Sequence, residues 1–297
     1  MTKRIGVIDI GTLKVKCQVV EVGKRGGLKT LHQSNTLTIL GHGKEATIEE
    51  LKLCKKLFEK FKVTKLRVVS THALREMGEG GKKLASEIKN KVGFDVEIIS
   101  AKEEAELFFK AVLSDFETDE DFTIIDVGGG SVQILIGNKN QLKKSYLIKT
   151  GTMTLWNKFV PGHTGKDAPN LFQVKNITKF VKEELSEVPH GLKTPIIYGS
   201  SCVIELFFGM RIPVRPFNKS KSHPYVAEIS HLEKFLEDIW LIPYDEREKR
   251  YKSPTPKYMW GIDMGLTNVL TLAKIVDAPY IIPSNANINQ GLIKSLL

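Results

Sequence analysis

The sequence IDVGGGSVQILIG, residues 125–137, ends an apolar run with one carboxylate, Asp126, and follows it with three glycines and Ser131. A shorter copy, IDIGTLKVKCQVV, occupies residues 8–20 and has Asp9 in the place of Asp126. In both copies apolar and β-branched residues stand on either side of the glycines, which is typical of two β-strands joined by a tight turn. The repeated strand–turn–strand start predicts that the chain folds into two similar domains.

Short apolar runs alternate with helical patterns along the rest of the chain. Apolar side chains recur at helical spacing over residues 47–61, 84–92, 101–113, 177–185 and 231–239. The runs LRVVS and FDVEIIS, which end at Ser70 and Ser100, are expected as strands. Strands that alternate with helices predict an α/β fold with central sheets. The acidic segment of residues 115–121 is interpreted as the domain boundary, which gives domains 1–117 and 118–297.

The composition is that of a folded, water-soluble protein. Hydrophobic residues make up 41% of the 297 residues, more than is typical of disordered chains. No apolar run approaches the ~18–20 residues that span a bilayer, and the N-terminal apolar stretch meets Asp9 too soon for a signal peptide. The three cysteines are isolated and provide neither a disulfide framework nor a metal-binding spacing. We therefore expect a cytoplasmic protein with reduced thiols and no membrane partner.

The charge of the chain favours polyanionic partners. Lys and Arg number 44 against 34 Asp and Glu, for a net charge of +10. A basic balance of this size suits nucleic acid, anionic lipid or a phosphate-rich substrate. The sequence has no zinc-finger spacing and no basic stripe interleaved with aromatic residues, so no nucleic-acid partner is expected.

The two glycine turns have the composition of phosphate-binding loops. Glycine lets the backbone approach a ligand closely and adopt positive φ, and successive backbone N–H groups in a turn can bind an anion. Thr12 and Ser131 add hydroxyl groups beside the glycines, and Asp9 and Asp126 are placed to hold a hydrated Mg²⁺ against phosphate oxygens. An ordinary hairpin turn with Asp as turn former is the alternative, and the duplication counts against it.

Two further segments carry candidate site residues. In ISAKEEAELFFKAV, residues 99–112, Glu104 begins a helical face that is otherwise apolar. Burial of a carboxylate costs free energy unless a partner compensates it, so Glu104 is interpreted as a site residue and candidate base rather than a solvated first-turn glutamate. In STHALREM, residues 70–77, Arg75 follows a strand and has the geometry to bind a phosphate.

Taken together, these segments resemble the exopolyphosphatase/guanosine pentaphosphate phosphohydrolase (Ppx/GppA) phosphatase family, within the actin-like ATPase superfamily. The resemblance rests on IDIGT, STHALRE, IISAKEEAELFFKAV and IIDVGGGSVQILIG in the family's order and spacing, with weaker matches in KTGTMTLWNKF, IIYGSSCVIEL and NINQGLI. It covers most of the chain and points to a short member. It implies two actin-like (ribonuclease H-like) lobes with mixed central sheets flanked by helices and a cleft between them.

The resemblance also implies an activity and roles for residues. The family removes the terminal phosphate from inorganic polyphosphate or from pppGpp with Mg²⁺. Glu104 matches the family's catalytic glutamate, and Asp126 matches its metal- and water-linked aspartate; Asp9 is the second expected metal ligand. The expected phosphate-binding residues are Gly11, Thr12, Lys14, Arg75, Gly128, Gly129, Gly130, Ser131 and Gln133.

Several positions depart from the family pattern. Leu13 and Lys14 stand where the first loop usually has Asn and Ser, Gln133 replaces a glutamate, and Cys202 begins a pair that replaces Gly-Thr. Lys14 adds a positive charge that suits phosphate, whereas Gln133 removes a negative charge from the expected metal site.

Three functions follow as hypotheses. The first is a Mg²⁺-dependent phosphohydrolase that acts on polyphosphate or pppGpp. The second is a sensor that binds polyphosphate or guanosine polyphosphates with little or no catalysis, and these departures from the family pattern motivate it. The third is an actin-like ATPase or kinase, against which the absence of a Gly-Gly-Thr adenosine turn counts. If the protein self-associates, a homodimer is the expected form.

Overall fold

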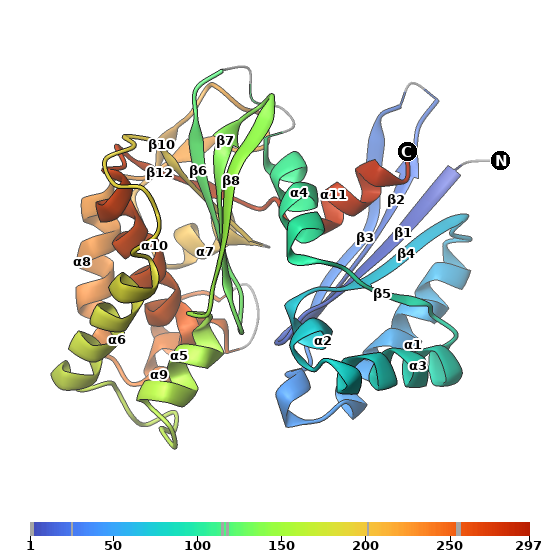
Figure 1. Ribbon diagram of the computed structural model, residues 1–297, viewed down its shortest axis with the longest axis horizontal. Helices are drawn as coiled ribbons and strands as arrows, with labels where there is room; N and C mark the ends of the chain where they lie inside the picture. The colour runs from blue at the N-terminus through green and yellow to red at the C-terminus, as the bar shows by residue number, and fades with distance from the viewer. Residues whose placement is uncertain (1–2, 25, 114–115, 117–118, 201, 254–256) are drawn as a thin grey trace. The chain divides into compact units, whose positions relative to one another are not determined.

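The computed structural model describes residues 3–24, 26–113, 116, 119–200, 202–253 and 257–297. The chain forms two compact units (Figure 1). The first unit consists of Met1–Ala111 and Asn287–Leu297, and the second of Val112–Ala286.

The first unit is built on a mixed sheet of five strands, in the order β3-β2-β1-β4-β5. The strands are β1 (Lys3–Ile10), β2 (Lys14–Val22), β3 (Leu28–Leu37), β4 (Lys65–Ser70) and β5 (Val96–Ile98). The helices are η1 (Leu40–His42), α1 (Glu45–Lys60), α2 (His72–Glu76), α3 (Glu79–Val92), α4 (Ala101–Val112) and, from the end of the chain, α11 (Ile288–Ser295). β1 and β2 pair antiparallel, whereas β1, β4 and β5 run parallel.

The two faces of this sheet are covered by different pairs of helices. Ile8 and Ile10 of β1 are buried with residues of α1 and α3, whereas Ile5 and Val7 are buried with residues of α4 and α11. Successive side chains of a strand point to opposite faces, so two apolar sets in one strand require cover on both faces. The continuous apolar run of β1 is explained in this way.

The C-terminal helix returns to the first unit. Leu292 and Ile293 of α11 are buried in the same cluster as Ile5 and Val7. A Cβ at Gly291 would lie 2.1 Å from the carbonyl oxygen of Leu107 in α4, so only glycine permits this approach. The predicted domain of 118–297 differs from the structure here, because the sequence NINQGLI does not specify the sheet on which it packs. The predicted boundary itself, at residues 117 and 118, lies outside the described residues.

The second unit repeats the topology of the first. Its five-stranded sheet has the order β12-β9-β6-β7-β8, with β6–β7 and β7–β8 antiparallel and β6–β9 and β9–β12 parallel. These strands are β6 (Phe122–Val127), β7 (Val132–Asn138), β8 (Gln141–Ile148), β9 (Ile196–Gly199) and β12 (Ile281–Ser284), beside a small pair, β10 (Arg215–Pro216) and β11 (Tyr225–Val226). The helices are α5 (Thr152–Phe159), α6 (Leu171–Glu184), α7 (Val203–Gly209), α8 (Ile229–Trp240), α9 (Tyr244–Arg250), η2 (Tyr258–Gly261) and α10 (Ile262–Val276).

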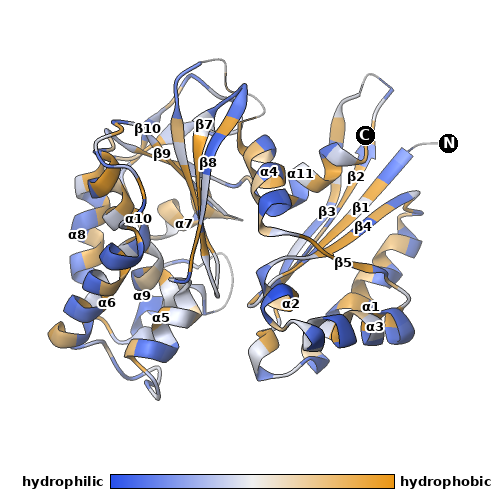
Figure 2. Ribbon diagram, in the orientation of Figure 1, coloured by the Kyte–Doolittle hydropathy of each residue, from blue (hydrophilic) through white to orange (hydrophobic). Residues whose placement is uncertain are grey.

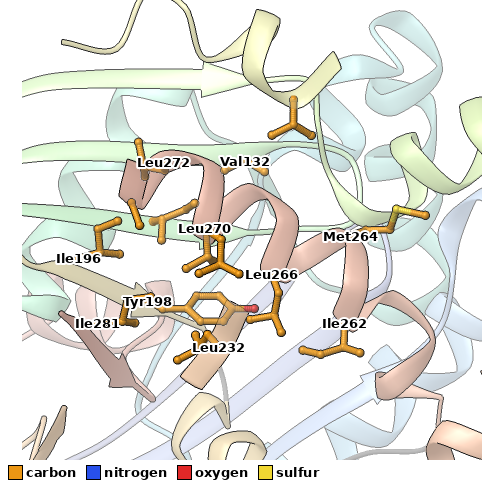
Figure 3. Packing of buried hydrophobic residues seen from close by; sticks show 14 of the residues in the cluster. Val132, Ile196, Tyr198, Leu232, Ile262, Met264, Leu266, Leu270, Leu272 and Ile281 are labelled. Atoms are coloured by element: carbon orange, nitrogen blue, oxygen red, sulfur yellow. The ribbon is translucent and has the colours of Figure 1, made fainter. Parts of the chain in front are cut away.

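The core of the second unit lies between its sheet and α10. Figure 3 shows Leu266 and Leu270 of α10 close to Tyr198 of β9 within this cluster. One ion pair is also buried there: Arg247 Nη1 lies 2.9 Å from Asp263 Oδ2, and neither side chain is exposed. The pair fixes α9 against α10, although burial raises the pKa of Asp263 despite the opposing effect of Arg247.

The prediction of an α/β fold with two mixed sheets flanked by helices is confirmed, as is the repeated strand–turn–strand start. Figure 2 shows the central strands of both sheets coloured mainly as hydrophobic and α1 and α3 with long hydrophilic stretches. Among the described residues, no helix combines the length and the apolar character needed to cross a membrane.

Candidate active site

Three predicted residues of the first unit lie at one edge of its sheet. Asp9 lies near the end of β1, which pairs in parallel with β4, and β4 pairs in parallel with β5. The carboxyl ends of parallel strands share one edge, where α/β proteins place ligand-binding residues. Arg75 lies in α2, the helix that follows β4. Glu104 lies in the first turn of α4, the helix that follows β5.

Arg75 and Glu104 form a direct ion pair. Nη1 and Nη2 of Arg75 each lie 3.0 Å from Oε2 of Glu104, and Nη1 also donates to the carbonyl oxygen of Ile99 at 2.9 Å. The two side chains are 22% and 17% exposed, so the pair is partly shielded from water. The expected apolar stripe that begins at Glu104 is present, because Leu107 and Phe108 are buried. The structure therefore gives Glu104 the compensating partner that its burial requires.

Asp9 is held by two residues that sequence reasoning did not select. Lys16 Nζ lies 3.4 Å from Asp9 Oδ2, and the hydroxyl of Thr71 lies 3.5 Å from Asp9 Oδ1. The Asp9 side chain is 5% exposed. Lys16 is the cross-strand partner of Asp9 in the β1–β2 ladder. The signal that could have identified Lys16 is strand alternation, because it lies two residues beyond Lys14 on the same face.

The two glycine loops have equivalent hydrogen bonds. The amide of Gly11 donates to the carbonyl oxygen of Lys14 at 2.9 Å, and the amide of Gly128 donates to that of Ser131 at 2.9 Å. We call residues 11–14 the first loop and residues 128–131 the second loop. Asp9 and Asp126 precede the loops at equivalent positions, so the duplication seen in sequence is also a duplication of geometry.

The carbonyl groups of the second loop accept hydrogen bonds from the start of α5. The amide of Thr152 donates to Gly128 O at 3.0 Å, and the amides of Met153 and Thr154 donate to Gly129 O at 2.9 and 3.2 Å. The hydroxyl of Thr154 donates to Gly130 O at 2.9 Å. The carbonyl group of each glycine in the loop therefore accepts a hydrogen bond from the start of α5.

These hydrogen bonds fix the direction in which three amide N–H groups of the loop point. In a trans peptide the N–H group points opposite to the C=O group of the same plane, and no described peptide bond is cis. The N–H groups of Gly129, Gly130 and Ser131 share their planes with the three carbonyl groups bound by α5, so they point away from that helix. Within the described chain, none of the three donates to a backbone carbonyl. Successive amides directed to one side form an anion-binding site.

Positive φ is not the reason for glycine in these loops. The described glycines with positive φ lie elsewhere in the chain, so of the two properties of glycine only close approach applies to these loops. Lack of space explains the glycine at position 128, because a Cβ added there would lie only 3.0 Å from Ser131 O. Close packing of backbone on backbone is the physical requirement.

The first loop is supported in a similar but smaller way. The amide of Leu40 donates to Thr12 O at 2.9 Å, and the amides of Thr38 and Ile39 donate to Leu13 O at 2.9 and 3.0 Å. Two peptide planes are oriented here, against three in the second loop. Lys14, which is half-buried, follows these planes at the start of β2.

Comparison with models of known protein families identifies the family of this chain. The model of the Ppx/GppA phosphatase family matches residues 27–249. The chain belongs to the Ppx/GppA family. The resemblance drawn from the glycine loops, STHALRE and the Glu104 helix is thereby confirmed.

The chain is also similar to a known relative and, in its fold, to solved structures. The chain is 26% identical over 201 residues to exopolyphosphatase 2 of Mycobacterium tuberculosis, and this match covers 61% of each chain. The Ppx/GppA family member of Aquifex aeolicus has a similar fold, with a TM-score of 0.80 at 24% identity over 100% of this chain and 98% of that one. An exopolyphosphatase from Cytophaga hutchinsonii gives a TM-score of 0.83 at 21% identity, over 99% and 97% of the two chains.

In this Ppx/GppA chain, Asp126 has a neutral cross-strand partner. Gln133 lies opposite Asp126 in the β6–β7 ladder, the position that Lys16 occupies opposite Asp9. Gln133 is 6% exposed, and its Nε2 has no hydrogen-bond partner in the described chain. Burial raises the pKa of Tyr258 in η2, and Cys202 and then Asp126 add to this effect. Tyr258 was missed in sequence, where nothing links η2 to the end of β6.

Asp126 and Gln133 are compatible with a Mg²⁺ ion. A carboxylate oxygen and a side-chain amide oxygen are both ligands that Mg²⁺ accepts, and the ion commonly takes its remaining ligands from water and substrate phosphates. Asp9 fits such an ion less well, because the ammonium group of Lys16 already neutralises it. No cluster of three or more His, Cys, Asp or Glu side chains suited to a metal is present among the residues described.

Proposed function

We propose that this protein is a Mg²⁺-dependent phosphohydrolase that releases terminal phosphate from inorganic polyphosphate. The observation that carries the proposal is the set of three amides of the second loop, which α5 directs to one side, beside Asp126. Three N–H donors in one turn match the oxygens of a phosphoryl group and stabilise charge that develops in the transition state. The family and the exopolyphosphatase relatives support polyphosphate as the substrate class; pppGpp is the second substrate to be tested.

Each residue has a defined part in the proposed reaction. Glu104 orients a water molecule and accepts its proton as the water oxygen attacks the terminal phosphorus. The bridging P–O bond breaks, and the shortened polyphosphate leaves with the electron pair. Arg75 holds Glu104 in position, and the amides of Gly129, Gly130 and Ser131 bind phosphate oxygens. The remaining predicted donors, Gly11, Thr12 and Lys14, are proposed to bind phosphate groups through the first loop.

Magnesium is proposed at Asp126, with Gln133 as a neighbour. When bound, the ion would draw negative charge from the phosphoryl oxygens. Asp9 is proposed instead as the counter-ion that positions Lys16, because Lys16 Nζ is 3.4 Å away and the Asp9 carboxylate is almost fully buried.

A catalytically weak polyphosphate sensor is the second candidate, and Gln133 is the observation that favours it. Its buried Nε2 lacks a partner in the described chain and would donate to a phosphate oxygen. The family's glutamate at this position would instead add a negative charge beside Asp126.

Gln133→Glu separates the two candidates. For the enzyme, we expect Mg²⁺ to bind about tenfold more tightly and kcat to rise, because a second carboxylate is a stronger ligand than an amide. The measurements are Mn²⁺ affinity by electron paramagnetic resonance and Mg²⁺-dependent phosphate release. Weaker polyphosphate binding, with no phosphate released by either protein, would instead identify the sensor. Gln141→Glu, an exposed position at the start of β8, is the matched control.

Polyphosphate binding is expected to weaken steeply with salt. The net charge of +10 and the cation Lys14 at the end of the first loop motivate this, because salt screens charges beyond about 8–10 Å at physiological strength. Lys14→Gln should reduce the slope of log Kd against log salt, whereas Lys83→Gln on the exposed face of α3 should leave it unchanged. Titration calorimetry at several salt concentrations measures both slopes. Binding that does not depend on salt would contradict an electrostatic site.

A further inference from the structure

The start of α5 makes four hydrogen bonds to the second loop, and none of the residues that donate them was predicted as a site residue. The amides of Thr152, Met153 and Thr154 and the hydroxyl of Thr154 together bind the carbonyl groups of three successive peptide planes. A helix N-terminus often binds an anion through its unpaired amides. In this protein those amides are directed to peptide carbonyl groups instead.

Gly151 permits this contact. A Cβ at Gly151 would lie 2.4 Å from Gly129 O, from the carbonyl carbon of Gly130 and from the amide nitrogen of Ser131. All three atoms are backbone atoms, so no side-chain rotation could relieve the overlap. Gly151 is the residue before α5, and its φ of −57° is one that any residue adopts. Close approach to the loop is therefore the reason for glycine at this position.

A buried pair of side chains fixes the chain just before Gly151. The hydroxyl of Thr150 donates to Asn268 Oδ1 at 2.6 Å, and Asn268 Nδ2 donates back to Thr150 O at 2.9 Å. Asn268 belongs to α10 and is fully buried. Thr150 is also fully buried, so the start of α5 is tied to the core of the second unit. A helix held in this way can hold the loop that it contacts.

We propose that Gly151 and Thr154 are positioning residues that set the three amides of the second loop for phosphate. The hydrogen bonds from α5 fix the orientation of the peptide planes, and they polarise each plane so that its N–H group becomes a stronger donor. The positive end of the α5 dipole adds to this effect through the peptide groups. The inference rests on the proposed function for the identity of the anion, but the orientation of the amides does not depend on turnover.

Thr154→Val is the sharpest test, because valine keeps the shape and the β-branch and removes only the hydroxyl. We expect it to weaken binding of inorganic tripolyphosphate about fivefold to tenfold and to lower kcat/KM on polyphosphate by a similar factor. Thr154→Ser restores the donor and should restore both. Thr178→Val is the matched control, because its hydroxyl also donates to a backbone carbonyl, that of Val174, at 2.9 Å on α6. Gly151→Ala should have a larger effect, about 100-fold, because the loop must move.

Two measurements make the test decisive. Amide ¹H–¹⁵N spectra of the ligand-free protein should show shifts at Gly130 and Ser131 in Thr154→Val and none in Thr178→Val or Thr154→Ser. Unchanged loop amides would overturn the inference. If the wild type binds tripolyphosphate, equally tight binding by Thr154→Val would also overturn it. If the amides shift as expected but the wild type binds no tripolyphosphate, the positioning stands and the proposed phosphate function fails. Thermal unfolding of each variant shows whether it is folded, and Thr154→Val keeps the test available if Gly151→Ala does not fold.

Discussion

Glu104→Gln is expected to lower kcat on polyphosphate by about 10²- to 10⁴-fold, the usual contribution of a general base. Glutamine keeps an oxygen for the two Arg75 contacts at 3.0 Å, so the edge of the first sheet should stay intact. It cannot accept the proton of the attacking water. Tripolyphosphate binding, measured by calorimetry, should therefore remain close to that of the wild type while turnover falls.

The neighbouring glutamate provides the control. Glu103 lies on the same helix, but its side chain is 42% exposed and pairs with Arg67. The amide of Glu103 donates to the hydroxyl oxygen of Ser100, and its carboxylate accepts from Arg67, so Glu103 has a structural role at the start of α4. Glu103→Gln should leave kcat within a factor of about two, as is usual for surface substitutions. Equal rates for wild type and Glu104→Gln would assign Glu104 to packing and to the Arg75 pair alone.

Asp126→Asn should have the second largest effect, a loss of about 10²- to 10³-fold in kcat/KM at limiting Mg²⁺. The substitution removes the carboxylate from the proposed metal ligands and leaves two neutral amides, at positions 126 and 133. A bound metal contributes several kcal/mol to stabilising charge in the transition state, which is the origin of this magnitude. Kinetics over a range of Mg²⁺ concentrations and direct Mn²⁺ binding both measure it.

A second aspartate next to the same strand controls for this result. Asp121 immediately precedes β6, and its carboxylate lies 2.6 Å from Lys143 Nζ. Asp121→Asn should change neither Mn²⁺ binding nor kcat/KM. If Asp126→Asn binds Mn²⁺ as tightly as the wild type, the metal assignment is wrong. If Asp9→Asn alone abolishes Mn²⁺ binding, the metal belongs at Asp9 and the role given to Lys16 fails.

The fold could be predicted from the sequence because its signals are local and repeated. Two copies of strand, glycine turn and strand specify the antiparallel start of each sheet, and helical spacing predicted α4 and α8 within two residues at each end. The helix α6 begins at Leu171, six residues before the predicted start at residue 177. The family assignment followed from the same motifs. The return of α11 to the first unit was not predictable, because its apolar face fits either sheet and the choice depends on tertiary packing at Gly291.

The candidate site was predictable only in part. Asp9, Glu104 and Asp126 carry charges at the ends of apolar runs, and such contrasts are visible in sequence. The contacts that orient them are long-range: Arg75 meets Glu104 across 29 positions, and Thr154 meets Gly130 across 24. Gly151 looked like an ordinary residue before a helix. Its importance depends on how closely two backbones approach, and a sequence pattern does not report that distance.

The proposed phosphohydrolase activity is measured directly as phosphate release. Long-chain polyphosphate, pppGpp and ATP are incubated in parallel with the wild type and with Glu104→Gln, each with Mg²⁺ and with EDTA. We expect rapid Mg²⁺-dependent release from polyphosphate by the wild type, with little release by Glu104→Gln or with EDTA. Turnover of ATP alone would support the actin-like ATPase or kinase alternative. Tight polyphosphate binding without any phosphate release by the wild type would show that the protein is a sensor and not a phosphohydrolase.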